Sequence, residues 1–447
     1  MIARLGDLRN CFEGAVPSAF ATCSKDGTPN VAYLSQVHYV DGDHVALTYQ
    51  FFNTTRKNIL ANRRATVQVV DPDTAAHYRL HLEYLRTETE GPLFENMKAK
   101  LAGIASHTGM SKVFRLLGSD IYKVLKIDHV FGEPALDASR SQCLLSSLRT
   151  CLTEVGRCGD LARLFDEALE ALERNFDIRH VMLLIHDERR NRLYTVATRG
   201  YQQSGVGSEI CVGEGIIGVA ARERTPIRIG YVANEYLYGR VAREGFAQSG
   251  GVDALETEIP FPGLRNSSSQ LAVPLTRDTR LLGVLYMESP QERRFTYEDE
   301  DALAVLASQL ALLIEVLSEA PEPQDEPAMA ATPAPVQGAP VAIQHFAADH
   351  SVFIDNEYLI KGVAGAILRK LVGDYVEAGR TEFTNRELRL DCTLGLPDIT
   401  DNLEARLILL QRRLAEHCKF LGLEKTGRGR FRLNVSRPLR LTDAPGR

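Results

Sequence analysis

The feature that most constrains the fold is a Pro- and Ala-rich segment at residues 319–344, EAPEPQDEPAMAATPAPVQGAPVAIQ. Proline removes backbone donors and small side chains cannot build a core, so the segment predicts a semi-rigid linker. A chain of 447 residues is also too long for one hydrophobic core. We therefore expect a multidomain protein with a sensor part before the linker and an output part after it.

A softer boundary lies near residues 132–140, GEPALDASR, where strand-like sequence gives way to a long helical pattern. The expected organisation has four segments: a first domain at 1–135, a second at 140–318, the linker at 319–344 and a last domain at 345–437.

Composition points to a folded protein without a membrane segment. Hydrophobic residues make up 44% and charged residues 25%, as in ordinary globular proteins. We find no apolar stretch of the roughly 18 residues that a membrane helix needs and no signal peptide, so we expect a cytoplasmic protein. The eight cysteines contain no C-x-x-C pair, which argues against a disulfide framework and a metal site.

The first domain contains short strands separated by turn signals such as KDG and VDGD. The strand segments are SAFATCSKDG, TPNVAYLSQVHYV, HVALTYQ and ATVQVVD. This pattern predicts an all-β meander that closes into a small barrel.

A short helix in FFNTTRKNILANRRA, residues 51–65, begins with hydroxyl and basic side chains. A helix N-terminus offers free N–H groups and a positive dipole end, and Thr54, Thr55, Arg56 and Lys57 add donors suited to a phosphate monoester. The alternative is an ordinary helix cap with a solvated basic turn.

Residues 12–130 resemble the pyridoxamine 5′-phosphate oxidase-like, FMN-binding split-barrel family. The resemblance rests on the strand order, the TxRKNI element and the closing strand GSDIYKVLKIDHV. In that family the flavin ring lies across a dimer interface and the Ser/Thr-Arg/Lys element holds the FMN phosphate. The resemblance therefore implies a homodimer, with Thr54, Thr55, Arg56, Lys57 and Asn58 on the phosphate side and Ser35, Gln36 and Tyr49 on the ring side.

The arginines that clamp a substrate phosphate in the vitamer-oxidising members have no counterpart that we can place in this sequence. Vitamin B6 oxidation is therefore not expected, and enzyme activity is left open. Haem, a deazaflavin or no ligand at all are alternatives to FMN.

Residues 140–318 mix long helices with the strands HVMLLIHD, RLYTVATRG, SQLAVPL and LLGVLYME, which predicts an α+β sandwich. Gly213, Gly215 and Gly218 form a G-x-G-x-x-G pattern, but no buried strand precedes it, so we reject a dinucleotide site. The segment resembles a GAF domain. The resemblance implies a small-molecule pocket under the loops near residues 229–266, and a ligand-free dimerisation module is the alternative.

The last helix of this segment carries leucines at alternating spacings of three and four, which suits a two-stranded coiled coil. The same leucines could instead pack on the GAF sheet, and we expect both roles. They are Leu303, Leu306, Leu310, Leu313 and Leu317.

The last domain is basic: from residue 402 onward, eleven Lys and Arg stand against four Asp and Glu. Its pattern predicts two short strands, a helix, a second helix opened by a Thr384–Glu387 capping box, a basic helix and a basic hairpin. This order and the runs LQRRL and TGRGRF resemble the winged-helix DNA-binding domain of two-component response regulators. The resemblance implies an α+β winged helix that binds DNA through Arg406, Arg412, Arg413, Lys425, Arg428, Arg430 and Arg432.

One departure favours an alternative role. The basic helix contains four consecutive apolar residues, 407–410, so its outer face is less polar than a groove-reading helix should be. The alternatives are a winged helix that contacts protein and a solvated basic face that has neither role. At the level of the whole chain, the two hypotheses are a DNA-binding regulator that responds to a ligand or flavin state, and a flavin-dependent oxidoreductase with accessory domains.

Overall fold

The computed structural model describes residues 4–12, 18–34, 36–49, 53–72, 74–91, 93–98, 101, 116–132, 144–230, 259–319, 337–391, 394 and 403–444. These residues pack as two compact units. One unit holds the described residues of 151–210, 259–263 and 309–444, and the other holds the rest.

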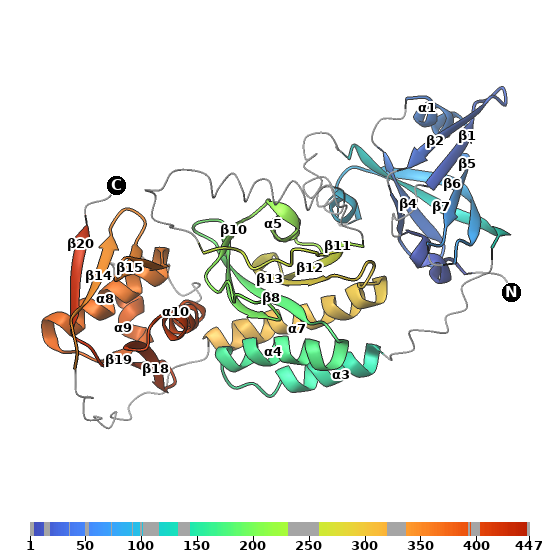
Figure 1. Cartoon of the computed structure of the whole chain (residues 1–447). Helices are drawn as coiled ribbons and strands as arrows, with labels where there is room; N and C mark the ends of the chain where they lie inside the picture. Colours follow the sequence, from blue (N-terminus) through green and yellow to red (C-terminus); the bar gives the residue numbers. More distant parts are fainter. Residues whose placement is uncertain are drawn as a thin grey trace. The chain divides into compact units, whose positions relative to one another are not determined.

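The N-terminal domain is β-rich and barrel-like, as predicted (Figure 1). Its seven-stranded sheet has the order β2-β1-β5-β6-β7-β4-β3, and burial alternates along β1 and β5, so one face of each strand points to the core. Strand β6 was not predicted. The elements are η1 (Leu5–Phe12), β1 (Ser18–Cys23), β2 (Pro29–Leu34), β3 (Val37–Tyr39), β4 (His44–Tyr49), α1 (Asn53–Ala61), β5 (Arg64–Val70), β6 (His77–Glu88) and β7 (Gly118–Phe131).

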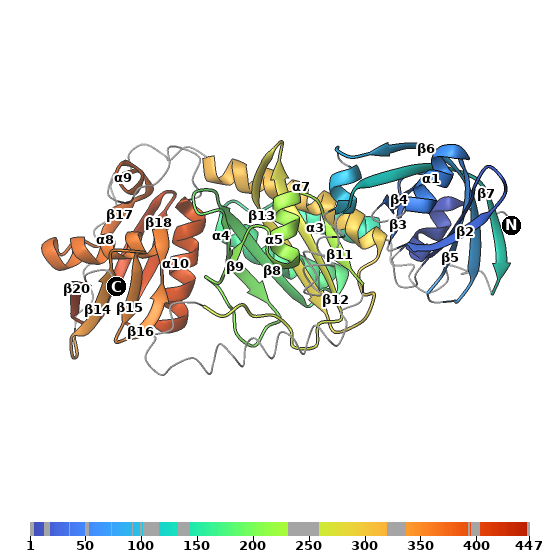
Figure 2. The ribbon, with the colours of Figure 1, turned by 90° about the horizontal axis from the view of Figure 1, so that it is seen from above.

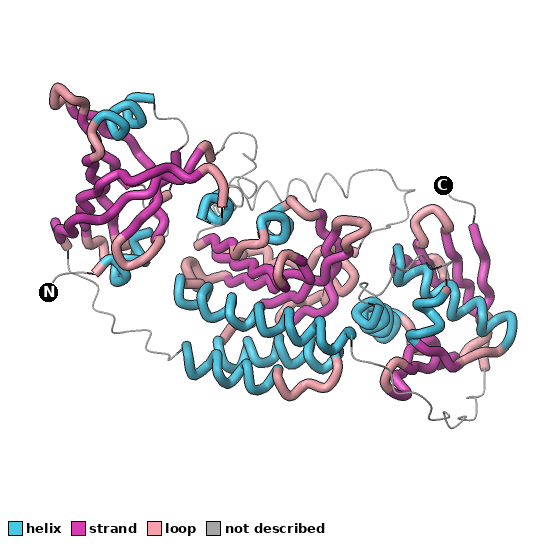
Figure 3. The backbone as a smooth tube through the Cα atoms, turned by 180° about the vertical axis from the view of Figure 1, so that it is seen from behind, coloured by secondary structure: helices cyan, strands magenta, loops and turns pink. Residues whose placement is uncertain are grey.

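The central domain is an α+β sandwich. Its six-stranded sheet has the order β10-β9-β8-β13-β12-β11. Helices α3, α4 and α7 cover one face and α5 lies on the other (Figure 3). The elements are α3 (Leu144–Val155), α4 (Leu161–Phe176), β8 (His180–Asp187), β9 (Arg192–Arg199), β10 (Glu209–Cys211), α5 (Gly215–Glu223), β11 (Ile227–Ile229), β12 (Ser269–Arg277), β13 (Arg280–Ser289) and α7 (Tyr297–Glu319).

The described residues of the C-terminal domain form a four-stranded sheet of order β16-β15-β14-β20, a three-stranded sheet of order β17-β19-β18, and the helices α8, α9 and α10 (Figure 2). The predicted capping box is present, because Thr384 accepts from the amide of Glu387 and the Glu387 carboxylate accepts from the amide of Thr384. The elements are β14 (Val341–Phe346), β15 (Ser351–Ile354), β16 (Glu357–Ile360), α8 (Gly362–Ala378), β17 (Glu382–Thr384), α9 (Asn385–Leu390), α10 (Leu403–His417), β18 (Leu421–Gly427), β19 (Arg430–Val435) and β20 (Leu439–Ala444).

Two strands extend this domain beyond the boundaries expected from sequence. β14 begins at Val341, inside the predicted linker, and β20 ends at Ala444, after the predicted end at 437. The two strands pair in parallel from Val341 and Leu439 onward. The alternating apolar residues of β14 follow the linker prolines directly, which is why composition alone placed the boundary too late.

Helix α7 changes two expectations. Residues Tyr297–Ser318 are long and apolar enough to cross a membrane by length and composition alone, contrary to our reading of the sequence. A core helix of a soluble domain passes the same test, and the leucines on the inner face of α7 are buried. Leu303, Leu306 and Leu310 are therefore core residues, and only Leu313 and Leu317 of the predicted seam are half-buried.

The six described cysteines are free thiols. Three of them are buried, and burial raises the pKa of Cys11 to about 12 and those of Cys151 and Cys418 to about 11. These thiols are protonated packing groups at neutral pH.

Candidate functional site

Helix α1 brings the predicted phosphate-side residues together, but some of them are buried and others are exposed. Thr55 and Asn58 are buried and hold the helix on its sheet: Asn30 donates to Thr55 Oγ1 at 2.9 Å, and Asn58 donates to Thr22 Oγ1 at 3.2 Å. Thr54 and Lys57 are exposed. No hydrogen bond or ion pair connects either of these two to another described residue, so both are available to an anion.

Arg56 is engaged inside the barrel-like domain. Its guanidinium donates to Asp120 Oδ1 at 2.5 Å and lies 4.7 Å from the centroid of the Tyr49 ring and 5.6 Å from that of Tyr84. Thr87 donates to the same carboxylate oxygen at 2.5 Å. Burial raises the pKa of Asp120, and these two donors oppose that shift by stabilising the charged form. Arg56 therefore forms an ion pair with the buried carboxylate of Asp120.

The predicted ring-side residues show an unsatisfied polar atom. Gln36 is buried and its Oε1 has no hydrogen-bond partner among the described residues, and the buried hydroxyls of Ser119 and Tyr122 have none among them either. Ser119 lies opposite Thr48, whose hydroxyl donates to the Gln36 carbonyl at 3.4 Å. Buried polar atoms without partners are costly, so this corner fits a ligand that supplies hydrogen bonds. Ser35 lies outside the described residues.

Sequence reasoning missed Asp120, Ser119 and Tyr122, although their strand was quoted as part of the barrel. The available signal was the polar pair Ser119–Asp120 directly before Ile121 and Tyr122 at the start of β7, which is the buried part of that strand. Polar side chains in a buried strand segment need partners, and such partners are often functional.

Helix α10 carries three of the predicted DNA-binding arginines, but it does not present them to solvent. Arg406 and Arg413 are both 5% exposed. Arg406 forms an ion pair with Asp187 at 3.2 Å, and Arg413 donates to the carbonyl of Leu359 at 3.0 and 3.1 Å. In this arrangement Arg406 and Arg413 do not reach a nucleic acid, contrary to the sequence expectation.

Arg412 is also held by protein groups. It donates to the carbonyl of Val196 at 2.8 Å and to Asp166 at 2.6 Å. The apolar run 407–410 on the same helix is buried throughout. The unusual apolar character noted in the sequence therefore reflects contact with protein.

The β18–β19 hairpin places its basic residues in different surroundings. Lys425 pairs with Glu404 at 3.0 Å, and Arg432 pairs with Glu382. Arg428 is exposed next to Gly429, whose φ of +66° permits the tight turn, and Arg430 is half-buried. Arg428 forms no ion pair with another described residue, so it is the arginine most open to an external anion.

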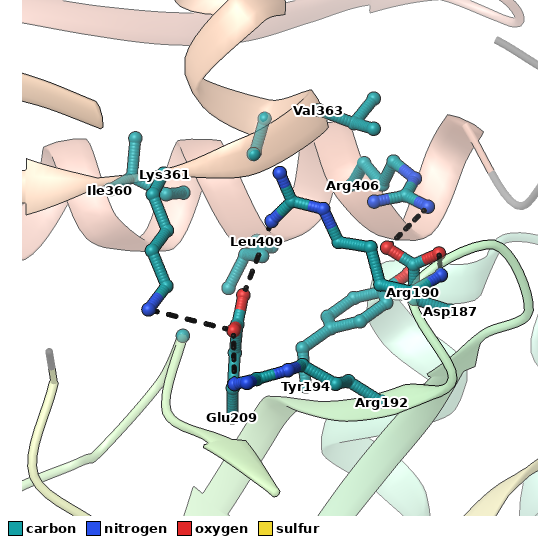
Figure 4. A pocket seen from close by; sticks show the side chains of 13 residues that line it. Asp187, Arg190, Arg192, Tyr194, Glu209, Ile360, Lys361, Val363, Arg406 and Leu409 are labelled. Atoms are coloured by element: carbon teal, nitrogen blue, oxygen red, sulfur yellow. Dashed lines mark hydrogen bonds and ion pairs between the residues drawn. The ribbon is translucent and has the colours of Figure 1, made fainter. Parts of the chain in front are cut away.

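A small pocket lies where β8, β9 and β10 meet the start of α8 and the middle of α10 (Figure 4). Cations outnumber acids in its lining. Glu209 lies 3.3 Å from Arg192, 3.7 Å from Lys361 and 4.0 Å from Arg190, and Asp187 pairs with Arg406 on the other side. The pocket thus lies between two groups of ion pairs that connect the central sheet to the C-terminal domain.

Comparison with known proteins defines two of the parts. Residues 7–117 match the family model described as pyridoxamine 5′-phosphate oxidase, and residues 158–315 match the GAF domain model. The chain therefore carries a pyridoxamine 5′-phosphate oxidase-like N-terminal domain and a GAF domain, as predicted. No curated protein matches the chain.

Solved structures resemble the two parts separately. The GAF domain of an Acinetobacter phosphoenolpyruvate-protein phosphotransferase shares 19% identity, covers 39% of this chain and 93% of its own, and has a TM-score of 0.30. A free methionine-R-sulfoxide reductase from Neisseria meningitidis shares 20% identity over 40% of this chain and 93% of its own, with a TM-score of 0.31. An FMN-binding protein from Syntrophomonas wolfei shares 18% identity over 28% of this chain and 86% of its own, with a TM-score of 0.25.

Proposed function

We propose that the protein is a cytoplasmic, homodimeric regulator in which an FMN-binding barrel and a GAF domain control a C-terminal winged helix that contacts DNA. The observation that carries this proposal is the order of elements after the linker. Helix α8, strand β17, helices α9 and α10 and the β18–β19 hairpin follow one another as in a winged helix, with the exposed Arg428 at the tip of the wing. The excess of eleven basic over four acidic residues from position 402 onward favours a polyanionic partner.

The N-terminal domain supplies the flavin site in this proposal. Thr54, Lys57 and the free amides at the start of α1 hold the FMN phosphate, and Gln36 and Ser119 offer their unsatisfied atoms to the ring side. FMN, when bound, supplies one- and two-electron redox chemistry. Arg56 holds Asp120 and the rings of Tyr49 and Tyr84 in position and so stabilises the geometry of this site.

The GAF domain is the proposed site of a small-molecule ligand. Most of the loop region expected to cover its pocket, residues 231–258, lies outside the described residues. The buried carboxylate of Glu288 accepts from the amide of Leu264 at 2.8 Å, so this acid helps to fix the described end of that region.

A flavin-dependent oxidoreductase with accessory domains is the second candidate, and the family match over residues 7–117 favours it. One experiment separates the two. The visible spectrum of the purified full-length protein is recorded, and a DNA duplex is titrated at several salt concentrations. A regulator binds DNA with an affinity that falls as salt rises. A yellow protein that oxidises a pyridine nucleotide but ignores DNA at every salt concentration is an oxidoreductase.

A further inference from the structure

Helix α10 has two differently used faces. Leu403, Leu407, Leu410 and Leu414 recur at helical spacing and form one apolar stripe. Arg406, Leu409 and Arg413 form a second stripe beside it, and all three are buried. A DNA-reading helix would need this second stripe in solvent.

The second stripe faces the central domain. Arg406 pairs with Asp187 at the end of β8 and lies 5.4 Å from the centroid of the Tyr194 ring on β9. Leu409 and Arg413 approach Gly207, which precedes β10: a Cβ on Gly207 would lie 3.7 Å from one and 3.5 Å from the other. Strands β8 and β9 thus offer Arg406 a carboxylate and an aromatic face at once.

A second contact is made by Arg412, six residues after Arg406 on α10. Arg412 reaches the carbonyl of Val196 on β9 and the carboxylate of Asp166 on α4. Asp166 is largely exposed and lies on the surface of α4, whereas the Arg406–Asp187 pair is buried, with both side chains less than a tenth exposed. The two contacts together form what we call the α10 latch: Asp187 and Asp166 with Arg406 and Arg412.

The buried charges of Arg406 and Asp187 favour this one arrangement of α10. Removing an arginine and an aspartate from water is costly, and a buried pair recovers that cost only when both partners are in place. Arg406 has its carboxylate only while α10 lies against β8 and β9. The carboxylates of Asp187 and Asp166 also present oxygens to the arginines as a phosphate backbone would.

We propose that the latch is an autoinhibitory contact in which the GAF domain covers α10 and occupies the arginines that would otherwise meet a nucleic acid. Docking of α10 is argued from the contacts alone, whereas its effect on DNA rests on the function proposed above. The GAF domain thereby controls the output helix directly: a change in the ends of β8 and β9 opens or closes the latch.

The test uses the full-length protein with Asp187→Asn and Asp166→Asn combined, which keeps side-chain size and removes both negative charges. Arginine side chains are modified with phenylglyoxal, and the modified sites are mapped by mass spectrometry. Arg406 is expected to be protected in the parent and to react at least about tenfold faster in the variant, because one partner of a buried pair has lost its charge. The exposed Arg428 should react equally in both.

Glu170→Gln is the matched control. It removes ion pairs of Glu170 with Arg174 and Arg199 inside the GAF domain, and no ion pair of Glu170 involves a residue of α10, all of which is described. If the double variant does not fold, Arg412→Ala is assayed in the same way. This substitution removes the exposed Arg412–Asp166 contact by changing the arginine instead of the aspartate. Arg406 that stays protected in every folded latch variant overturns the proposal.

A DNA titration of the same proteins separates the latch from the proposed function. Tighter binding by the latch variant, about tenfold or more, with Glu170→Gln unchanged from the parent, supports both. Faster modification of Arg406 with no DNA binding by any of the proteins supports the latch and contradicts DNA binding. Tighter DNA binding with Arg406 still protected contradicts the latch.

Discussion

Arg56 donates to Asp120 across 64 positions of sequence, so the arginine expected to hold a phosphate neutralises a buried carboxylate of its own domain. Lys57, its neighbour on α1, is exposed and has no such partner in the part of the chain that the structure describes. The two basic residues of one short motif therefore have different tasks, and substitution of each should have a different result.

Lys57→Ala should weaken flavin retention and leave the barrel folded. A charge-assisted hydrogen bond contributes about 1.5–3 kcal/mol, so flavin affinity should fall roughly 10- to 100-fold. Arg56→Ala should in addition lower the free energy of unfolding by about 1–3 kcal/mol, because Asp120 loses its cation. Flavin absorbance after gel filtration and thermal unfolding measure the two effects. Lys25→Ala, at another exposed lysine, is the control, and unchanged flavin content in the Arg56/Lys57 double variant would show that α1 does not hold the phosphate.

Replacement of Arg428 and Arg430 by Ala at the tip of the hairpin should weaken binding to all DNA sequences alike. If both residues contact phosphates, the slope of log affinity against log salt should shrink by about 0.9 for each lost contact. Fluorescence anisotropy at several salt concentrations measures it, with Arg157→Ala in the central domain as control. The same affinity and slope in variant and parent would instead assign the hairpin to protein contact.

The protein should sediment as a homodimer through its N-terminal domain. β2 is an edge strand, and its Val31 and Tyr33 are 65% and 74% exposed, as expected for a surface that a second copy covers. Val31→Lys with Tyr33→Lys should yield monomers in analytical ultracentrifugation. Leu145→Lys, at an equally exposed leucine of α3, should not. A parent protein that sediments as a monomer at micromolar concentration would refute the expectation.

Asp443 should stabilise the C-terminal domain in neutral but not in strongly acidic solution. Its hydrogen bond with Arg369, and then that with His345, lower its pKa to about 2. Because the folded value lies below the ordinary value of 3.8, the contribution is complete above that pH and disappears as the pH falls towards 2. Asp443→Asn should cost less than about 1 kcal/mol near pH 7, since the pair is half exposed. Urea unfolding should show a larger difference from the parent at pH 7 than at pH 2.5, because the contribution is only partly lost at the lower pH.

His350 should make the same domain less stable in mild acid. Burial, and then the neighbouring His345, lower the pKa of His350 below 6.5. The unfolded chain therefore takes up the proton first, and stability decreases as the pH falls through 6.5. His350→Gln should reduce this decrease between pH 7 and pH 5, as followed by thermal unfolding. An identical pH profile in parent and variant would locate the sensitivity elsewhere.

Local rules predicted the local structure well. The capping box formed because Thr384 and Glu387 are three residues apart, and the strands β1, β4, β5, β8, β9, β12 and β13 formed where apolar β-prone residues recur. The two domain families were recognisable for the same reason, since each is carried by a contiguous run of sequence.

The environment of the arginines could not be predicted in this way. The sequence of a helix does not show whether its arginine binds a phosphate or a carboxylate such as that of Asp187. The partner of Arg406 comes from a strand of another domain. The one available sign was the apolar run 407–410, which required a protein surface to cover it. For Arg56, the pairing with Asp120 depends on the strand order of the barrel-like sheet, which no short motif encodes.

The burial of α10 along residues 405–410 has a consequence for how any affinity of this protein is measured. If α10 is held by the proposed latch, only molecules in which this helix has detached bind a nucleic acid through it. The dissociation constant observed for the intact chain equals the intrinsic constant divided by the population of detached molecules. With about one molecule in a hundred detached, a strong binder would be recorded as roughly a hundredfold weaker.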